Sequence, residues 1–255
     1  MAIKPFPARV YALLGKFFHK EIVEWFDLFK KAYNALTAGL AASRIVATDA
    51  SGNLEDVDDL TAWIASTDGH LTVADDGDGS VTIDLEDTWV DINIGGVSLG
   101  KGATAPDLVQ VNGGAIYLPG FDGNATTEQL FGSIELDHFY KEGTIITPHV
   151  HWMPSTGNAG DVKWQLTYAF AVDGAVITAE TTVSGITAAG GVAWDTKQTE
   201  LGTIAGTGRK IEDQLLFRFF RIPTGDDTYG DDAVMATIGF HLEKDTIGSR
   251  TLSAK

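Results

Sequence analysis

The sequence predicts a mainly β protein: an antiparallel β-sandwich or jelly roll that follows an N-terminal α-helix and a small β connector. Two observations lead to this prediction. After residue 87, short segments of alternating apolar and polar residues are separated by brief connections rich in Gly, Asp, Pro and Thr, with no helical pattern of about ten residues between them. The one long helical pattern lies at the start of the chain.

Residues 1–43 are predicted to form an amphipathic helix that anchors or oligomerises the chain. From residue 8 to residue 40, apolar residues recur at intervals of three or four, which places them along one side of a helix. The residues expected on this seam include Phe18, Ile22, Trp25, Phe29 and Leu36. Further aromatic residues widen the apolar side, so a single helix would leave it in contact with water. The helix therefore needs a partner, which is a copy of itself, another protein or its own β domain.

Residues 44–87 are predicted to form a small β connector. Apolar and polar residues alternate at 71–73 and at 80–85, and the residues between them are rich in Asp and Gly, which favours a hairpin turn. An earlier strand is expected to begin at Arg44 and to turn at residues 49–53.

Residues 88–255 are predicted to form the sandwich. Val162, Trp164 and Leu166 alternate with polar residues, which gives their strand one buried and one hydrated face. The candidate strands are residues 89–94, 115–118, 131–136, 145–152, 162–172, 175–183, 200–204, 214–221 and 233–242. Their close spacing favours antiparallel pairing over βαβ units.

The charge of the chain is negative and unevenly distributed. The sequence holds 18 basic and 35 acidic residues, for a net charge of −17. Residues 1–44 carry seven of the basic and three of the acidic residues, so the remainder is strongly acidic. An acidic surface repels phosphate groups, which argues against nucleic-acid binding. No apolar run of about 18 residues and no secretory signal pattern occur, so membrane insertion is not expected.

Two histidines in one predicted strand are candidate metal ligands. His149 and His151 lie two residues apart and therefore point to the same side of a strand, where both can reach one divalent ion. His241, in another predicted strand, is a candidate third ligand. Together with Gly143, the pair is similar to the first half of the cupin metal motif, but the Glu expected a few residues later is absent. A pair of structural histidines that binds no metal is the alternative.

Sequence patterns typical of enzymes lack their required context. Residues 96–100 match Gly-x-Ser-x-Gly and residues 95–102 match most of a phosphate-binding loop, but Pro106 follows where both motifs need a helix. The absence of Cys excludes a thiol nucleophile and disulfides. Two acidic loops, residues 75–80 and 226–232, are either calcium sites or hydrated turns. We therefore expect a protein that is not an enzyme and has no obligatory cofactor.

Three stretches of sequence carry a resemblance to a known class of proteins. They include Arg44-Ile-Val-Ala-Thr-Asp-Ala within residues 44–83, Gly143-Thr-Ile-Ile-Thr-Pro-His-Val-His, and Asp227-Thr-Tyr-Gly-Asp-Asp-Ala. These stretches resemble a connector and a recurring domain of tailed-bacteriophage virion structural proteins of the tail-fibre, head-fibre, spike or decoration type. The resemblance implies a homotrimeric component of the virion, assembled in the host cytoplasm, with capsid, portal or tail proteins as partners. It implies no catalytic residues.

These observations lead to three hypotheses. The first is an oligomeric fibre, spike or decoration subunit that its N-terminal helix anchors to the phage particle. The second is an adhesin for a host receptor or surface glycan, in which exposed aromatic rings stack on sugars. The candidates for such rings are Trp89, Tyr117, Trp152, Trp194 and Tyr229. The third is a cupin-like metal-dependent enzyme built on His149 and His151.

Overall fold

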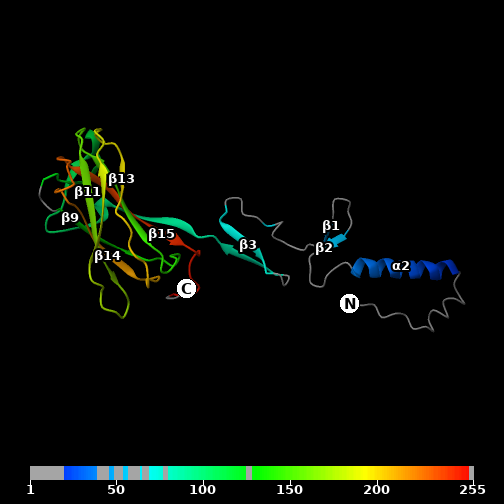
Figure 1. The fold of residues 1–255 in the computed structure, drawn as a ribbon. Helices are drawn as coiled ribbons and strands as arrows, with labels where there is room; N and C mark the ends of the chain where they lie inside the picture. Colours follow the sequence, from blue (N-terminus) through cyan, green and yellow to red (C-terminus); the bar gives the residue numbers. More distant parts are fainter. Residues whose placement is uncertain are drawn as a thin grey trace. The chain divides into compact units, whose positions relative to one another are not determined.

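The computed structural model describes residues 20–38, 46–48, 54–56, 64, 69–76, 80–124 and 128–252. The chain divides into two compact units, Met1–Asp84 and Leu85–Lys255 (Figure 1). The finer division into residues 1–43, 44–87 and 88–255 stays a prediction.

The first unit contains one described α-helix, α2 (Lys20–Ala38), as the helical pattern predicted. The apolar side chains of Ile22, Trp25 and Phe29 are exposed on it, and the rings of Trp25 and Phe29 stack with centroids 5.6 Å apart. Phe18 lies outside the described residues, and Leu36 belongs to α2 but its side chain is not described. In the part of the chain that the structure describes, no helix has the length and apolar character needed to span a membrane.

Two short hairpins follow α2. Strands β1 (Val46–Thr48) and β2 (Leu54–Asp56) pair antiparallel, and β3 (Leu71–Asp75) pairs with β4 (Val81–Leu85). The predicted hairpin between residues 71 and 85 is therefore confirmed.

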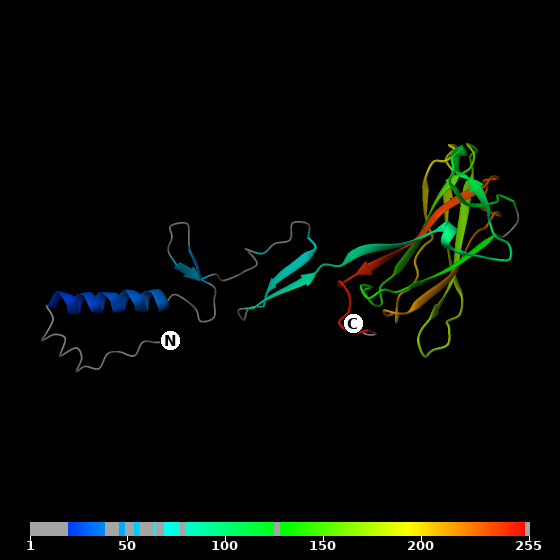
Figure 2. The ribbon, with the colours of Figure 1, turned by 180° about the vertical axis from the view of Figure 1, so that it is seen from behind.

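The second unit is an antiparallel β-sandwich, which confirms the predicted fold class. In the first sheet the strand order is β13 (Lys197–Glu200), β10 (Ile146–Pro154), β15 (Ala233–Lys244), β8 (Tyr117–Phe121) and β7 (Asp107–Gln110), and β5 (Thr88–Gly95) also pairs with β15. In the second the order is β12 (Thr181–Ala188), β11 (Asp161–Ala171), β14 (Gln214–Arg221), β9 (Gln129–Glu135) and β6 (Gly100–Lys101). Strands distant in the sequence lie side by side, as their different colours show in Figure 2.

The core lies between the two sheets and is rich in aromatic residues. Phe121 meets the Trp164 ring edge-on at 5.1 Å, and Phe219 stacks on Trp164 at the same centroid distance. Trp152 is fully buried, and its Nε1 donates a hydrogen bond of 2.9 Å to Thr199 Oγ1. Buried aromatic rings remove a large apolar area from water, and edge-on or offset contacts add to that stabilisation.

Two predicted strands are wrong in their bounds. The sequence predicts a strand over residues 175–183, but β12 begins only at Thr181, and Val176 lies in the preceding loop with 90% of its surface exposed. Residues 200–204 were also expected to form a strand, whereas β13 ends at Glu200 and Ile204 makes only an isolated bridge to Ile146. An apolar run does not show which residues find a hydrogen-bonding neighbour, because pairing depends on the adjacent strand.

One end of the sandwich is held by a buried ion pair between Arg221 of β14 and Asp227. Arg221 donates from Nε and Nη2 to the two carboxylate oxygens, at 2.9 and 2.8 Å. Its remaining donors bond the backbone carbonyls of Phe121, Asp231 and Tyr229. All five guanidinium N–H groups are therefore satisfied, which compensates the cost of burying the charge.

We expect Asp227→Asn to lower the free energy of unfolding by about 3–5 kcal/mol, because it leaves the Arg221 charge buried without its counterion. Chemical denaturation measures this. The matched control is Asp226→Asn, since Asp226 is 71% exposed and its ion pair with Lys163 lies in solvent. An exposed pair contributes little. Equal losses for the two variants would contradict a structural role for the buried pair.

Candidate functional site

The outer face of the first sheet carries a group of polar side chains on its three neighbouring strands β5, β15 and β10. Along each strand, alternate residues point into the core: Val90 and Ile92 on β5, Ile238 and Phe240 on β15, and Val150 and Trp152 on β10. The residues between them face outward, because successive side chains of a strand point to opposite sides. Asp91, His149 and His241 therefore share the outer face.

The strand register places these three residues next to one another. His241 of β15 lies opposite Asp91 of β5, and His149 of β10 lies opposite Gly239 of β15. A Cβ atom at Gly239 would lie only 2.6 Å from His149 Nε2. The glycine thus leaves the space through which the imidazole of His149 reaches across β15 toward Asp91.

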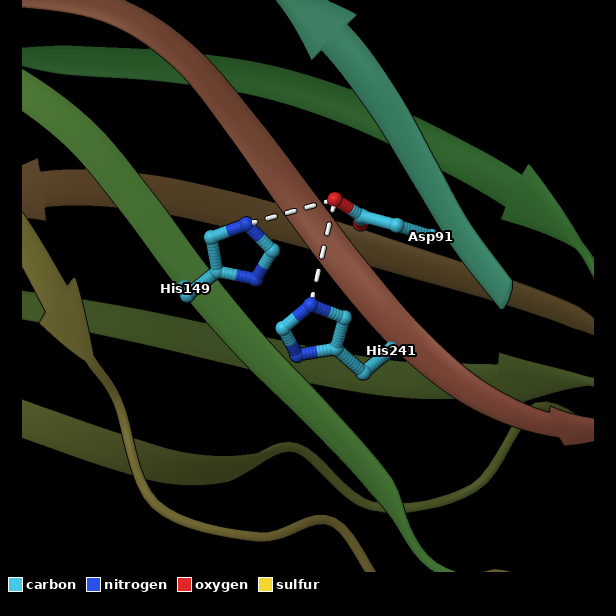
Figure 3. A group of neighbouring side chains, drawn as sticks. All are labelled: Asp91, His149 and His241. Atoms are coloured by element: carbon cyan, nitrogen blue, oxygen red, sulfur yellow. Dashed lines mark ion pairs between the residues drawn. The ribbon is translucent and has the colours of Figure 1, made fainter. Parts of the chain in front are cut away.

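Both histidines direct Nε2 toward the same carboxylate oxygen (Figure 3). Asp91 Oδ2 lies 3.6 Å from His149 Nε2 and 3.9 Å from His241 Nε2, and the potential ligand atoms of the three residues all lie within 4.8 Å of one another. The two imidazole rings stack with centroids 4.3 Å apart. Asn93 donates a hydrogen bond of 2.7 Å to Asp91 Oδ2, which orients the carboxylate.

The three side chains differ in their contact with solvent. The His149 side chain is 1% exposed, while those of His241 and Asp91 are 35% and 30% exposed. Burial lowers the pKa of His149; the neighbouring His241 and His151 lower it further, and the Asp91 charge opposes them. The buried imidazole is therefore held in its neutral form, which keeps a lone pair on one ring nitrogen.

Of the three histidines singled out in the sequence, the structure places two in this group. The His151 ring meets the His149 ring edge-on at a centroid distance of 5.0 Å, but His151 does not belong to the Asp91, His149 and His241 group. Asp91 was not singled out in the sequence. A carboxylate in a predicted strand was a weak signal, since nothing local indicated that this strand pairs with the one that carries His241.

The outer face of the second sheet forms a groove of about 570 Å³. Arg218 of β14 lies opposite Phe131 of β9 and Thr167 of β11. Its Nη2 donates to Thr167 Oγ1 at 3.3 Å, and its buried Nε has no hydrogen-bond partner. The Phe131 ring is 41% exposed. Polar lining is also supplied by Gln129 and Glu180.

Two carboxylates of one acidic loop are bound by neighbouring protein groups. In the loop at residues 226–232, Asp227 is bound by Arg221, and Asp231 accepts hydrogen bonds from Thr156 and Asn158, which lower its pKa. These carboxylates are engaged by the protein itself. Within the other acidic loop, residues 77–79 lie outside the described residues.

The enzyme-like glycine patterns are also structural. Gly96–Ser98 forms one short 3-10 turn, and β6 follows it where a catalytic or phosphate-binding motif needs an α-helix. Among the aromatic residues proposed to contact sugars, Trp152 and Tyr229 are buried, whereas Trp89 and Tyr117 are exposed. Trp194 is half-buried.

No protein-family model and no curated protein matches the sequence. The CBM36-1 domain of a multidomain xylanase from the hindgut metagenome of Trinervitermes trinervoides is 12% identical; the alignment covers 64% of this chain and 100% of that domain, with a TM-score of 0.34. CBM35 from Cellvibrio japonicus Abf62 is 8% identical; the alignment covers 65% of this chain and 99% of that one, with a TM-score of 0.33. Dimeric latent PorU from Porphyromonas gingivalis is 9% identical; the alignment covers 62% of this chain and 13% of that one, with a TM-score of 0.31. Similarities this distant do not indicate what the chain binds.

We expect Gly239→Ala to displace the His149 ring and to lower the free energy of unfolding by about 1–3 kcal/mol, because a methyl group would overlap the imidazole. Denaturation measures the loss, and the histidine Cε1–H resonances in NMR spectra report the ring displacement. Gly230→Ala is the matched control, since a Cβ atom there meets nothing within 4 Å. Unchanged histidine resonances in Gly239→Ala would refute this role of the glycine.

Proposed function

We propose that this protein is a non-enzymatic structural subunit of a tailed-phage particle, which its N-terminal unit attaches to the particle and whose β-sandwich is displayed. The observation that carries this proposal is the exposed apolar side of α2. Residues 44–83 and the stretches that begin at Gly143 and Asp227 resemble virion structural proteins. This resemblance is the reason for proposing a phage particle.

The exposed side of α2 supports an attachment role. A large apolar area of α2 is exposed to water, made up of the side chains of Trp25, Phe26, Leu28 and Phe29. Removing such an area from water is favourable by about 25 cal/mol per Å². The sandwich does not need this surface, since its two sheets bury their own aromatic core. Apolar spacing of three and four residues suits packing against other helices, and we propose that α2 packs against two further copies of itself in a trimer. The resulting helix bundle then binds a capsid, portal or tail protein of the particle.

A second candidate function is glycan binding in the groove of the second sheet. The specific observation is the exposed Phe131 ring beside Arg218, whose buried Nε has no hydrogen-bond partner. An aromatic face packs against the C–H side of a sugar ring, while guanidinium and carboxylate groups bond its hydroxyls. Gln129, Thr167 and Glu180 add further hydrogen-bonding groups around the same groove. This combination fits a displayed module that contacts a host surface polysaccharide.

Deletion of residues 1–43 tests the attachment role. We expect the truncated chain to keep a cooperatively folded sandwich, because the core of that unit is its own, and to be absent from purified phage particles. Circular dichroism and quantitative mass spectrometry of particles measure the two results. Within the intact chain, Trp25→Ala with Phe29→Ala should reduce the oligomer mass in light scattering, whereas Lys31→Ala should not. Normal incorporation of the truncated chain would rule out attachment through this segment.

Phe131→Ala and Arg218→Ala test the groove. We expect each to weaken binding of the purified protein to host surface polysaccharide at least tenfold, because each removes one side of the binding surface. Glycan arrays followed by calorimetry measure this. Ile186→Ala is the control, since Ile186 is exposed on β12 of the same sheet and does not line the groove. Failure of the unmodified protein to bind any host glycan would remove this candidate and leave the particle role standing.

A further inference from the structure

We propose that Asp91, His149 and His241 form a binding site for a divalent transition-metal ion such as Zn²⁺. The site lies on the outer face of the first sheet, and it shares no residue with the groove of the second sheet. It does not depend on the proposed particle role.

The donor atoms have the chemistry and spacing that such an ion requires. Two imidazole nitrogens and one carboxylate oxygen form a common ligand set for zinc, with bonds of about 2.0–2.2 Å. Ligands at that distance in a tetrahedron lie about 3.4 Å from each other. Asp91 Oδ2 is 3.6 Å from His149 Nε2 and 3.9 Å from His241 Nε2. The potential ligand atoms all lie within 4.8 Å of one another, so the partly exposed His241 ring must move closer to the other two residues for all three to reach one ion.

The environment of His149 gives a second, independent indication. Its side chain is almost completely buried, yet its Nδ1 has no hydrogen-bond partner, and its Nε2 lies 3.6 Å from the nearest Asp91 oxygen, which is too long for a hydrogen bond. A buried polar group without partners is costly. A proton on Nδ1 leaves the lone pair on Nε2, toward Asp91 and His241. An ion bound there would take this lone pair, so that Nε2 gains a partner, while Nδ1 would stay without one.

The ligands are supported by rigid structure and by charge. Each comes from a different strand of the same sheet, so backbone hydrogen bonds hold their Cα atoms in place. Asn93 fixes the Asp91 carboxylate through Oδ2, and a carboxylate has further lone pairs for a metal. Glu200 lies opposite His149 on β13 and adds negative charge. Because Asp91 and His241 are partly exposed, the ion would keep a coordination position open to water or to a ligand from a partner.

Metal titration of the untagged 255-residue chain, after removal of bound metal with a chelator, tests the site. We expect one Zn²⁺ per chain by calorimetry and by elemental analysis after dialysis, together with a rise in Tm, since an ion that binds only the folded state stabilises it. Ca²⁺ should bind at least tenfold more weakly, because imidazole favours Zn²⁺. Absence of a saturable Zn²⁺ site, or preference for Ca²⁺, would overturn the proposal.

Single substitutions show which residues bind the ion. His241→Ala and Asp91→Asn should each lower Zn²⁺ affinity at least tenfold; both residues are partly exposed, so these chains are expected to fold even if His149→Ala does not. Asn93→Ala should lower it about 10–100-fold through loss of carboxylate orientation. His138→Ala is the matched histidine control outside the group and should bind as the unmodified chain does. Equal loss in this control, or no loss in His241→Ala and Asp91→Asn, would show that the ion binds elsewhere.

Discussion

Strand β15 hydrogen-bonds to β10 along one edge and to β5 and β8 along the other, and the rest of the sandwich depends on this pairing. Its inward residues, such as Phe240, contribute to the core. Its outward residues, Gly239 and His241, shape the polar group on the surface. The same backbone hydrogen bonds therefore determine both the stability of the sheet and the spacing of the three candidate ligands.

The acidic residues of this chain serve different roles according to their surroundings. Asp227 is buried against Arg221, where a full set of hydrogen bonds compensates the loss of hydration. Asp231 orders a loop through Thr156 and Asn158. Asp91 faces two imidazoles instead, so of these three carboxylates it is the one directed at groups that bind metals in their neutral form. Overall acidity alone distinguishes none of these roles.

The predictions that the structure confirms rest on patterns that are strict and local. Alternation around Trp164 correctly indicated a strand with one buried face, and the seam through Trp25 correctly indicated a helix. The predicted strand at residues 175–183 is wrong in its first part, where Val and Ile favour a strand but the backbone makes only isolated hydrogen bonds, such as that from Thr178 N–H to the Phe170 carbonyl. The spacing of His149 and His151 pointed to metal chemistry, yet His151 lies outside the group that the structure assembles.

Which residues of a strand share a face follows from the sequence alone, because side chains alternate with a period of two regardless of what lies beside the strand. The apolar side of α2 follows from the sequence as well. That β5 and β10 flank β15 is visible only in the folded chain, since pairing depends on contacts between segments far apart in the chain. That pairing brings Asp91 to His149 and His241, and it does so because Gly239 has no side chain to block the approach.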